Sequence, residues 1–134
     1  MPSPYVSFDG HCAEAFSFYE QALGGKVVSI LKFKDAPPEA QIPGFENHVM
    51  HARMVINGLT LMGSDTGPWS PYQGMKGASL SVNYPDTQEA ETRFNALAAG
   101  GTVQMPFAKT FWAKGFGVLV DRFGVSWMVN SESK

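Results

Sequence analysis

This chain of 134 residues has one cysteine, little charge of either sign and no long apolar run. Because Cys12 cannot form a disulfide within the chain, we expect a reducing compartment, the cytoplasm. No stretch approaches the roughly 18 apolar residues of a membrane span, so no membrane partner is expected. Ten basic residues stand against 12 acidic ones, for a net charge of -2. With no basic patch, nucleic-acid binding is not expected either.

Apolar and aromatic residues are plentiful, by contrast. Hydrophobic residues make up 44% of the chain and aromatic residues 13%. This composition is typical of a globular protein, and the length suits one domain over residues 1–134 with a substantial core.

An internal repeat organises that domain. Residues 14–25 read EAFSFYEQALGG, and residues 89–101 read EAETRFNALAAGG. Each copy follows a short apolar run and precedes strand-like sequence, so the repeat is a supersecondary unit used twice. The pattern predicts an α+β fold of two β-α-β-β-β modules, residues 3–65 and 77–131. We expect their curled mixed sheets to surround a cleft.

In the first module, apolar residues recur at helical spacing from Cys12 to Leu23. Asp9 or Gly10 is the expected cap of that helix. The pair Asn57-Gly58 favours a tight hairpin. The predicted elements are a helix over 12–23, strands over 5–8, 26–34, 49–56 and 59–62, and a loop over 35–46.

In the second module, Asp86 is the expected helix cap, with Glu89 in the capping-box position. Gly100-Gly101 should end this helix, and Asp121 should make the last turn. The predicted buried helix face is Ala90, Phe94 and Leu97. The predicted strands are 79–84, 102–105, 116–120 and 126–129.

Four segments carry a family resemblance. They are residues 5–19 (YVSFDGHCAEAFSFY), 50–52 (MHA), 61–65 (LMGSD) and 111–127 (FWAKGFGVLVDRFGVSW). Together they resemble the vicinal oxygen chelate superfamily of glyoxalase I, bleomycin-resistance proteins and extradiol dioxygenases. The resemblance is closest to the PhnB-like branch, whose proteins often carry the name 3-demethylubiquinone-9 3-methyltransferase. It implies a small-molecule ligand and a homodimer.

Metal-dependent members of the superfamily place one His or Glu on each of four strands, where a divalent cation acts as Lewis acid. The resemblance puts these four positions at Pro4, Leu61 or Met62, Leu80 or Ser81, and Met128. These side chains are poor ligands for hard divalent cations, so we expect no metal and no other cofactor.

Two other clusters could offer metal ligands. One is Glu46 with His48 and His51, although strand alternation would turn the two histidines to opposite faces. The other comprises Asp9, His11 and Cys12, where a helix cap is the simpler interpretation.

Single residues also admit two interpretations. Cys12 could be a nucleophile at a helix N-terminus, or a small buried residue. His51 could be a general base, or a hydrogen-bonded structural histidine. Trp112 stands between two lysines in a loop, a poor place to bury a large ring, whereas Trp127 should belong to the core. The ligand-binding candidates are Phe8, His51, Met62, Phe111, Trp112 and Met128.

The function predicted from the sequence is metal-free binding of a small molecule in an apolar cleft, with catalysis left open. The alternatives are a metal-dependent lyase or isomerase like glyoxalase I, and a drug-sequestering resistance protein. Methyl transfer is not expected. A Rossmann-like methyltransferase needs a glycine-rich loop that opens a helix, and both Gly-Gly pairs here follow helices.

Overall fold

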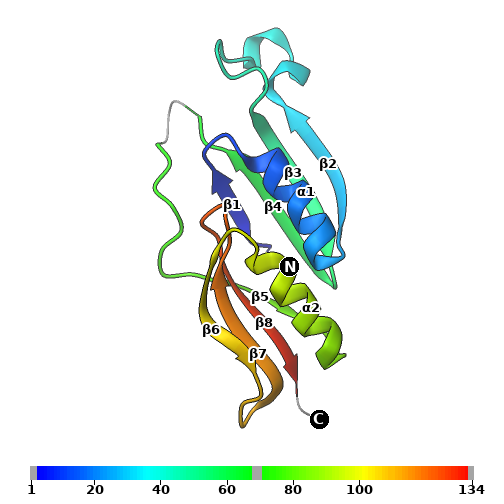
Figure 1. Ribbon diagram of the computed structural model, residues 1–134. Helices are drawn as coiled ribbons and strands as arrows, with labels where there is room; N and C mark the ends of the chain where they lie inside the picture. The colour runs from blue at the N-terminus through cyan, green and yellow to red at the C-terminus, as the bar shows by residue number, and fades with distance from the viewer. Residues whose placement is uncertain (1–2, 68–70, 133–134) are drawn as a thin grey trace. The chain divides into compact units, whose positions relative to one another are not determined.

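The computed structural model describes residues 3–67 and 71–132 (Figure 1). The chain forms two compact units. One comprises the residues up to Gly74 except 21–24, and the other comprises residues 21–24 and the residues from Met75 onward. None of the described helices is long and apolar enough to span a bilayer.

The first module has the predicted β-α-β-β-β order. Its sheet runs β1-β4-β3-β2, with β1 parallel to β4 and the other neighbours antiparallel, so the sheet is mixed. Asn57 and Gly58 both have positive φ, 44° and 87°, as the predicted tight hairpin requires. The elements are β1 (Tyr5–Phe8), α1 (Cys12–Leu23), β2 (Lys26–Lys32), β3 (Val49–Ile56) and β4 (Leu59–Asp65).

The second module repeats this order. Its sheet runs β5-β8-β7-β6, again with one parallel pair, β5 with β8. The predicted cap is confirmed, because the Asp86 side chain accepts a hydrogen bond from the Glu89 backbone N–H at 2.9 Å. The elements are β5 (Leu80–Asn83), α2 (Thr87–Ala98), β6 (Thr102–Ala108), β7 (Ala113–Val120) and β8 (Ser126–Glu132).

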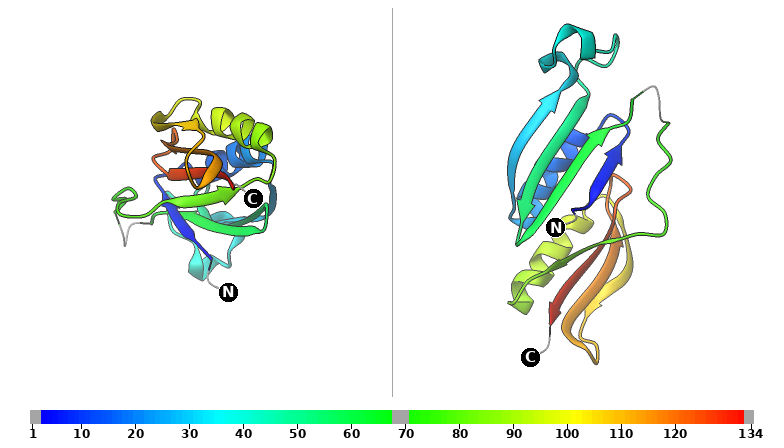
Figure 2. Two further views of the ribbon diagram at one scale, coloured as in Figure 1. Left: turned by 90° about the horizontal axis from the view of Figure 1, so that it is seen from below. Right: turned by 180° about the vertical axis from the view of Figure 1, so that it is seen from behind.

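In each unit, the helix lies across one face of its own sheet (Figures 1 and 2). In the first unit, Phe8 on β1 packs edge-on against Phe16 of α1, with ring centroids 6.2 Å apart. In the second, a Cβ at Gly117 on β7 would lie 2.6 Å from the ring of Phe94 on α2. The glycine therefore makes room for the helix to approach. The predicted buried face of α2, with Ala90, Phe94 and Leu97, is confirmed.

Several strand ends differ from the prediction. β2 stops at Lys32, two residues early, and Phe33–Asp35 forms a short 3-10 helix. The Asp35 carboxylate accepts the Lys32 backbone N–H at 3.0 Å, which favours a turn over further extension. A second 3-10 turn, Pro38–Ala40, lies in the predicted loop.

The strands β4, β6, β7 and β8 are longer than predicted. In each case backbone pairing with a neighbouring strand carries the element past its apolar run. β4 continues to Asp65, which pairs with Phe8, and Ala113 at the start of β7 pairs with Glu132. The alternation of apolar and polar residues in the sequence does not reveal which strands pair, so these extensions were not predicted.

The start of α1 has an acceptor that the sequence did not indicate. The first helical N–H, that of Cys12, donates to Asp65 Oδ1 at 2.9 Å, so a distant carboxylate takes a role expected of Asp9 or Gly10. The other oxygen of Asp65 accepts the Val49 N–H at 2.8 Å. One carboxylate, 4% exposed, thus joins the start of the helix to the start of β3.

Candidate ligand-binding face

The face of each sheet opposite its own helix carries the polar and half-buried side chains. We call it the open face of that sheet. Because successive residues of a strand point to opposite faces, the burial pattern identifies its members. Along β8, for example, Trp127 and Val129 are buried beneath the helix, whereas Met128 and Asn130 alternate with them.

On the open face of the first sheet, Tyr5, His51 and Met62 lie together. Tyr5 pairs directly with Met62 across the parallel β1–β4 ladder. The rings of Tyr5 and His51 are 5.9 Å apart and tilted by 35°. Arg53 pairs with Met62 from the other side and is exposed. Two of the predicted ligand candidates, His51 and Met62, are therefore neighbours of one tyrosine and one arginine.

On the open face of the second sheet, an aromatic cluster continues into apolar residues. Trp112 meets Phe116 of β7 with ring centroids 5.4 Å apart at 68°, and Phe111 meets Trp112 at 4.8 Å and 83°. Two residues beyond Phe116 on the same face, Val118 pairs with Met128 of β8. We call Trp112, Phe116, Val118 and Met128 the aromatic platform. Trp112 is 48% exposed and Phe111 is 96% exposed.

A hydroxyl group holds the hairpin tip that carries Phe111 and Trp112. Thr110 Oγ1 accepts the backbone N–H of Ala113 at 3.0 Å and that of Trp112 at 3.3 Å. The Thr110 N–H in turn donates to the Ala113 carbonyl at 3.1 Å. The tip is therefore a hydrogen-bonded turn that presents two large rings to solvent.

A row of polar side chains borders the platform. Asn130 pairs with Phe116 on one side and with Asn83 on the other. Asn130 Nδ2 donates to Asn83 Oδ1 at 2.8 Å, and Asn83 Nδ2 donates to Glu132 Oε1 at 3.0 Å. We call these three residues the polar row. Asn130 Oδ1 is buried and has no hydrogen-bond partner among the described residues.

The predicted site residues thus fall into three groups. His51 and Met62 lie on the first open face, while Phe111, Trp112 and Met128 lie on or beside the aromatic platform. Phe8 is placed differently: it is 1% exposed and packs against α1 in the core, so we drop it from the set. Side chains of β1 point alternately to the two faces of the sheet, so the aromatic residue of this strand on the open face is Tyr5.

Sequence reasoning missed Tyr5, Phe116 and the polar row. Strand parity alone could have found part of this set, because Asn130 and Glu132 are two and four residues beyond Met128. The hydrogen bonds to Asn83 depend on the parallel pairing of β5 with β8, which joins residues 47 positions apart.

Cys12 fits the structural interpretation. It is fully buried, and the pKa of its thiol is raised far above the usual range by burial and then by the nearby Asp65 carboxylate. A thiol held in its protonated form is a poor nucleophile and a poor metal ligand.

The positions that the resemblance assigns to the superfamily's metal ligands are Pro4, Leu61 or Met62, Leu80 or Ser81, and Met128. In the structure, Met62 pairs with Tyr5 on the first sheet, and Ser81 pairs with Met128 on the second. These side chains offer a hydroxyl and thioethers in place of histidine or carboxylate. Within residues 3–67 and 71–132, no three His, Cys, Asp or Glu side chains gather closely enough to hold a metal ion.

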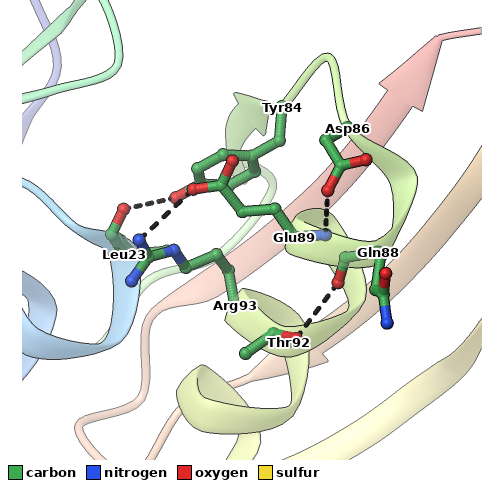
Figure 3. A network of polar contacts seen from close by, with 7 residues as sticks. All are labelled: Leu23, Tyr84, Asp86, Gln88, Glu89, Thr92 and Arg93. Carbon is green, nitrogen blue, oxygen red and sulfur yellow. Dashed lines mark hydrogen bonds and ion pairs between the residues drawn. The ribbon is translucent and has the colours of Figure 1, made fainter.

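A further polar network lies within the second unit, around Tyr84 and α2, and includes the carbonyl of Leu23 (Figure 3). The Tyr84 hydroxyl donates to the Leu23 carbonyl at 2.6 Å. Arg93 Nη2 pairs with Glu89 Oε2 at 3.3 Å, and the guanidinium fits where Gly24 has no side chain. Burial of the hydroxyl raises the pKa of Tyr84 to about 12. The nearby Arg93 charge lowers this pKa, and the Glu89 carboxylate raises it.

This raised pKa predicts a loss of stability at high pH. In the unfolded chain, tyrosine loses its proton near pH 10, whereas folded Tyr84 keeps it until about pH 12. The stabilisation is therefore complete below about pH 10 and is lost as the pH rises toward 12. Chemical denaturation across this range should show Tyr84 contributing a decline of at most about 1.4 kcal/mol per pH unit. Tyr84→Phe should remove that part of the decline, and Tyr72→Phe, at an exposed tyrosine, is the control.

The architecture defines the class of protein first. Two β-α-β-β-β modules with curled mixed sheets form the glyoxalase/bleomycin-resistance fold. The fosfomycin resistance protein FosX from Listeria monocytogenes shares it, with a TM-score of 0.68 over 99% of this chain and 93% of that one. Identity is 8%, so this likeness concerns the fold alone.

The family follows from closer comparisons. The family model described as 3-demethylubiquinone-9 3-methyltransferase matches residues 2–130, so the chain belongs to this PhnB-like family. Protein YjdN from Escherichia coli K12 is 36% identical over 97% of this chain and 95% of its own length.

Two solved structures are similar over nearly the full length. Protein PA1353 from Pseudomonas aeruginosa has a TM-score of 0.91 at 49% identity, and covers 100% of this chain and 98% of that one. A PhnB protein from Bacillus cereus, which carries the same methyltransferase name, has a TM-score of 0.80 at 30% identity. It covers 97% of this chain and 98% of that one.

Proposed function

We propose that this protein binds an apolar, planar small molecule on the open face of its second sheet, without the superfamily's metal. The observation that carries the proposal is the placement of Trp112. A tryptophan that is half exposed, stands on a hydrogen-bonded turn and meets Phe116 edge-on offers a face for a flat ligand.

The apolar residues beyond Trp112 support the same function. Phe116, Val118 and Met128 continue the surface along two paired strands, and methionine adapts to ligands of different shape. The fold is compatible with binding of a small molecule, since a mutant of FosX, which shares the fold, has been crystallised with Mn(II) and dihydroxypropylphosphonic acid. The metal in that protein is not carried over, because the donor set here does not fit one.

We do not extend the family's methyltransferase name to an activity. The Gly24-Gly25 and Gly100-Gly101 pairs follow α1 and α2, with φ of 76° at Gly24 and 77° at Gly100. They act as helix C-terminal caps, whereas a nucleotide-like cofactor is held where a glycine-rich turn opens a helix.

We further propose that two copies associate. Val28, Ile30 and Leu31 of β2 are each at least 36% exposed, and β2 is the last strand of its sheet. Exposed apolar side chains on an edge strand favour pairing with another chain.

The ligand-binding proposal is tested with naphthalene as the probe and methyl-labelled methionine as the reporter. Titration should shift the NMR signal of Met128 and leave that of Met54, which is fully buried in the first sheet, unchanged. Trp112→Ala should weaken binding about tenfold, because it removes a ring contact and the apolar area with it. Tyr72→Ala, at an exposed aromatic residue outside the platform, is the matched control. Equal affinity in wild type and Trp112→Ala would contradict the proposal.

A further inference from the structure

The polar row indicates what kind of planar ligand the platform selects. This inference rests on the proposed function, because it concerns the edge of the same face. Asn130 stands where the polar row meets the aromatic platform. Its neighbour on β7 is Phe116, a platform residue, and its neighbour on β5 is Asn83, a residue of the row. Side chains paired in this way lie about 5 Å apart at Cβ, so a flat molecule on Phe116 reaches Asn130.

The hydrogen bonds of the row have one direction. Each asparagine uses an amide N–H to donate along the row, first from Asn130 to Asn83 and then from Asn83 to Glu132. The acceptor of Asn130 is left over, because its Oδ1 is buried without a partner in the described part of the chain. A buried acceptor in that state costs free energy until a donor reaches it.

The charge that ends the row is negative, whereas the lysines that flank the turn with Trp112, Lys109 and Lys114, are exposed. Glu132 supplies a carboxylate that is hydrogen-bonded directly to the row, a second acceptor. At the row itself, the acceptors of Asn130 and Glu132 therefore favour a donor over an anion.

We infer that the ligand is an uncharged aromatic ring system carrying its own hydrogen-bond donor, a ring N–H or a phenolic O–H. The ring contacts Trp112 and Phe116, and the donor points to Asn130 Oδ1, displacing the side chains that cover this atom. Phosphate-bearing or carboxylate-bearing ligands are disfavoured at the same place.

The test compares indole, which has a ring N–H, with N-methylindole, which lacks it, and with indole carboxylate. Binding is followed by the Met128 methyl signal. Indole should bind at least about tenfold more tightly than N-methylindole, because N-methylindole leaves the acceptor of Asn130 unpaired; tenfold corresponds to about 1.4 kcal/mol. The carboxylate should bind no more tightly than N-methylindole.

Variants locate the effect. Asn130→Leu should abolish the preference for indole by weakening indole alone, whereas Asn130→Asp keeps an acceptor oxygen and should keep the preference. Asn95→Leu, at an exposed asparagine of α2, is the matched control and should change nothing. Thermal unfolding of each variant establishes that it is folded before titration.

The outcomes separate this inference from the proposed function. If indole and N-methylindole bind equally, and both depend on Trp112, the platform stands and the donor inference is overturned. If the carboxylate binds most tightly, the donor inference is also overturned. If no probe depends on Trp112, the proposed function itself fails, and the inference fails with it.

Discussion

Trp127→Ala should lower the free energy of unfolding by about 3–5 kcal/mol, the largest effect expected of a single substitution in this chain. Trp127 is fully buried beneath α2 and pairs with Leu80 and Leu119 on the neighbouring strands. Its removal leaves a cavity in the core of the second sheet. Urea denaturation followed by circular dichroism measures the change.

The indole N–H of Trp127 adds a polar component to this effect. Nε1 donates to Asp121 Oδ2 at 2.9 Å, and Asp121 Oδ1 accepts the backbone N–H groups of Phe123 and Val125. Trp127→Phe keeps most of the ring and removes this donor, so it should cost about 1–3 kcal/mol. Trp112→Ala is the control, because a half-exposed ring should cost clearly less. Equal losses at Trp112 and Trp127 would show that Trp112 is an ordinary core residue.

Asp65→Ala should destabilise the protein by about 2–6 kcal/mol. The substitution leaves two buried backbone N–H groups, those of Cys12 and Val49, without their acceptor. Each unsatisfied group costs about 1–3 kcal/mol. Asp65→Asn keeps one acceptor oxygen and should recover part of the loss.

Asp9→Ala provides the matched comparison for Asp65. Asp9 is exposed, precedes the same helix and was the cap expected from the sequence. Its replacement should change the free energy of unfolding by less than about 0.5 kcal/mol. If Asp9→Ala were as costly as Asp65→Ala, the assignment of the cap to Asp65 would be wrong.

The difference between Asp9 and Asp65 shows where sequence reasoning succeeds. α1 was predicted with its exact bounds, because helical spacing and a following glycine are local signals. The carboxylate that caps it lies 53 residues away, and only the parallel pairing of β1 with β4 brings it there. A contact between residues so far apart cannot be predicted from the periodic pattern of apolar residues in the sequence.

The candidate site divides in the same way. Trp112 was recognised from its neighbours in sequence, since a tryptophan between two lysines suggests a surface position. Phe8 was misassigned, because one residue of shift along a strand exchanges the open face for the core. The polar row was missed because Asn83 and Asn130 lie on separate strands and become neighbours only when β5 pairs with β8.

The turn at Thr110 separates the proposed ligand contacts from the hydrogen bonds that hold the chain. Its hydroxyl and backbone form the turn without using the rings of Phe111 or Trp112. Those two side chains can therefore be exchanged for others while the turn keeps its shape. A rigid support also spares the ligand the entropy of ordering a loop. Under the proposed function, substitutions at these two positions should change which ligand is bound and leave the core intact.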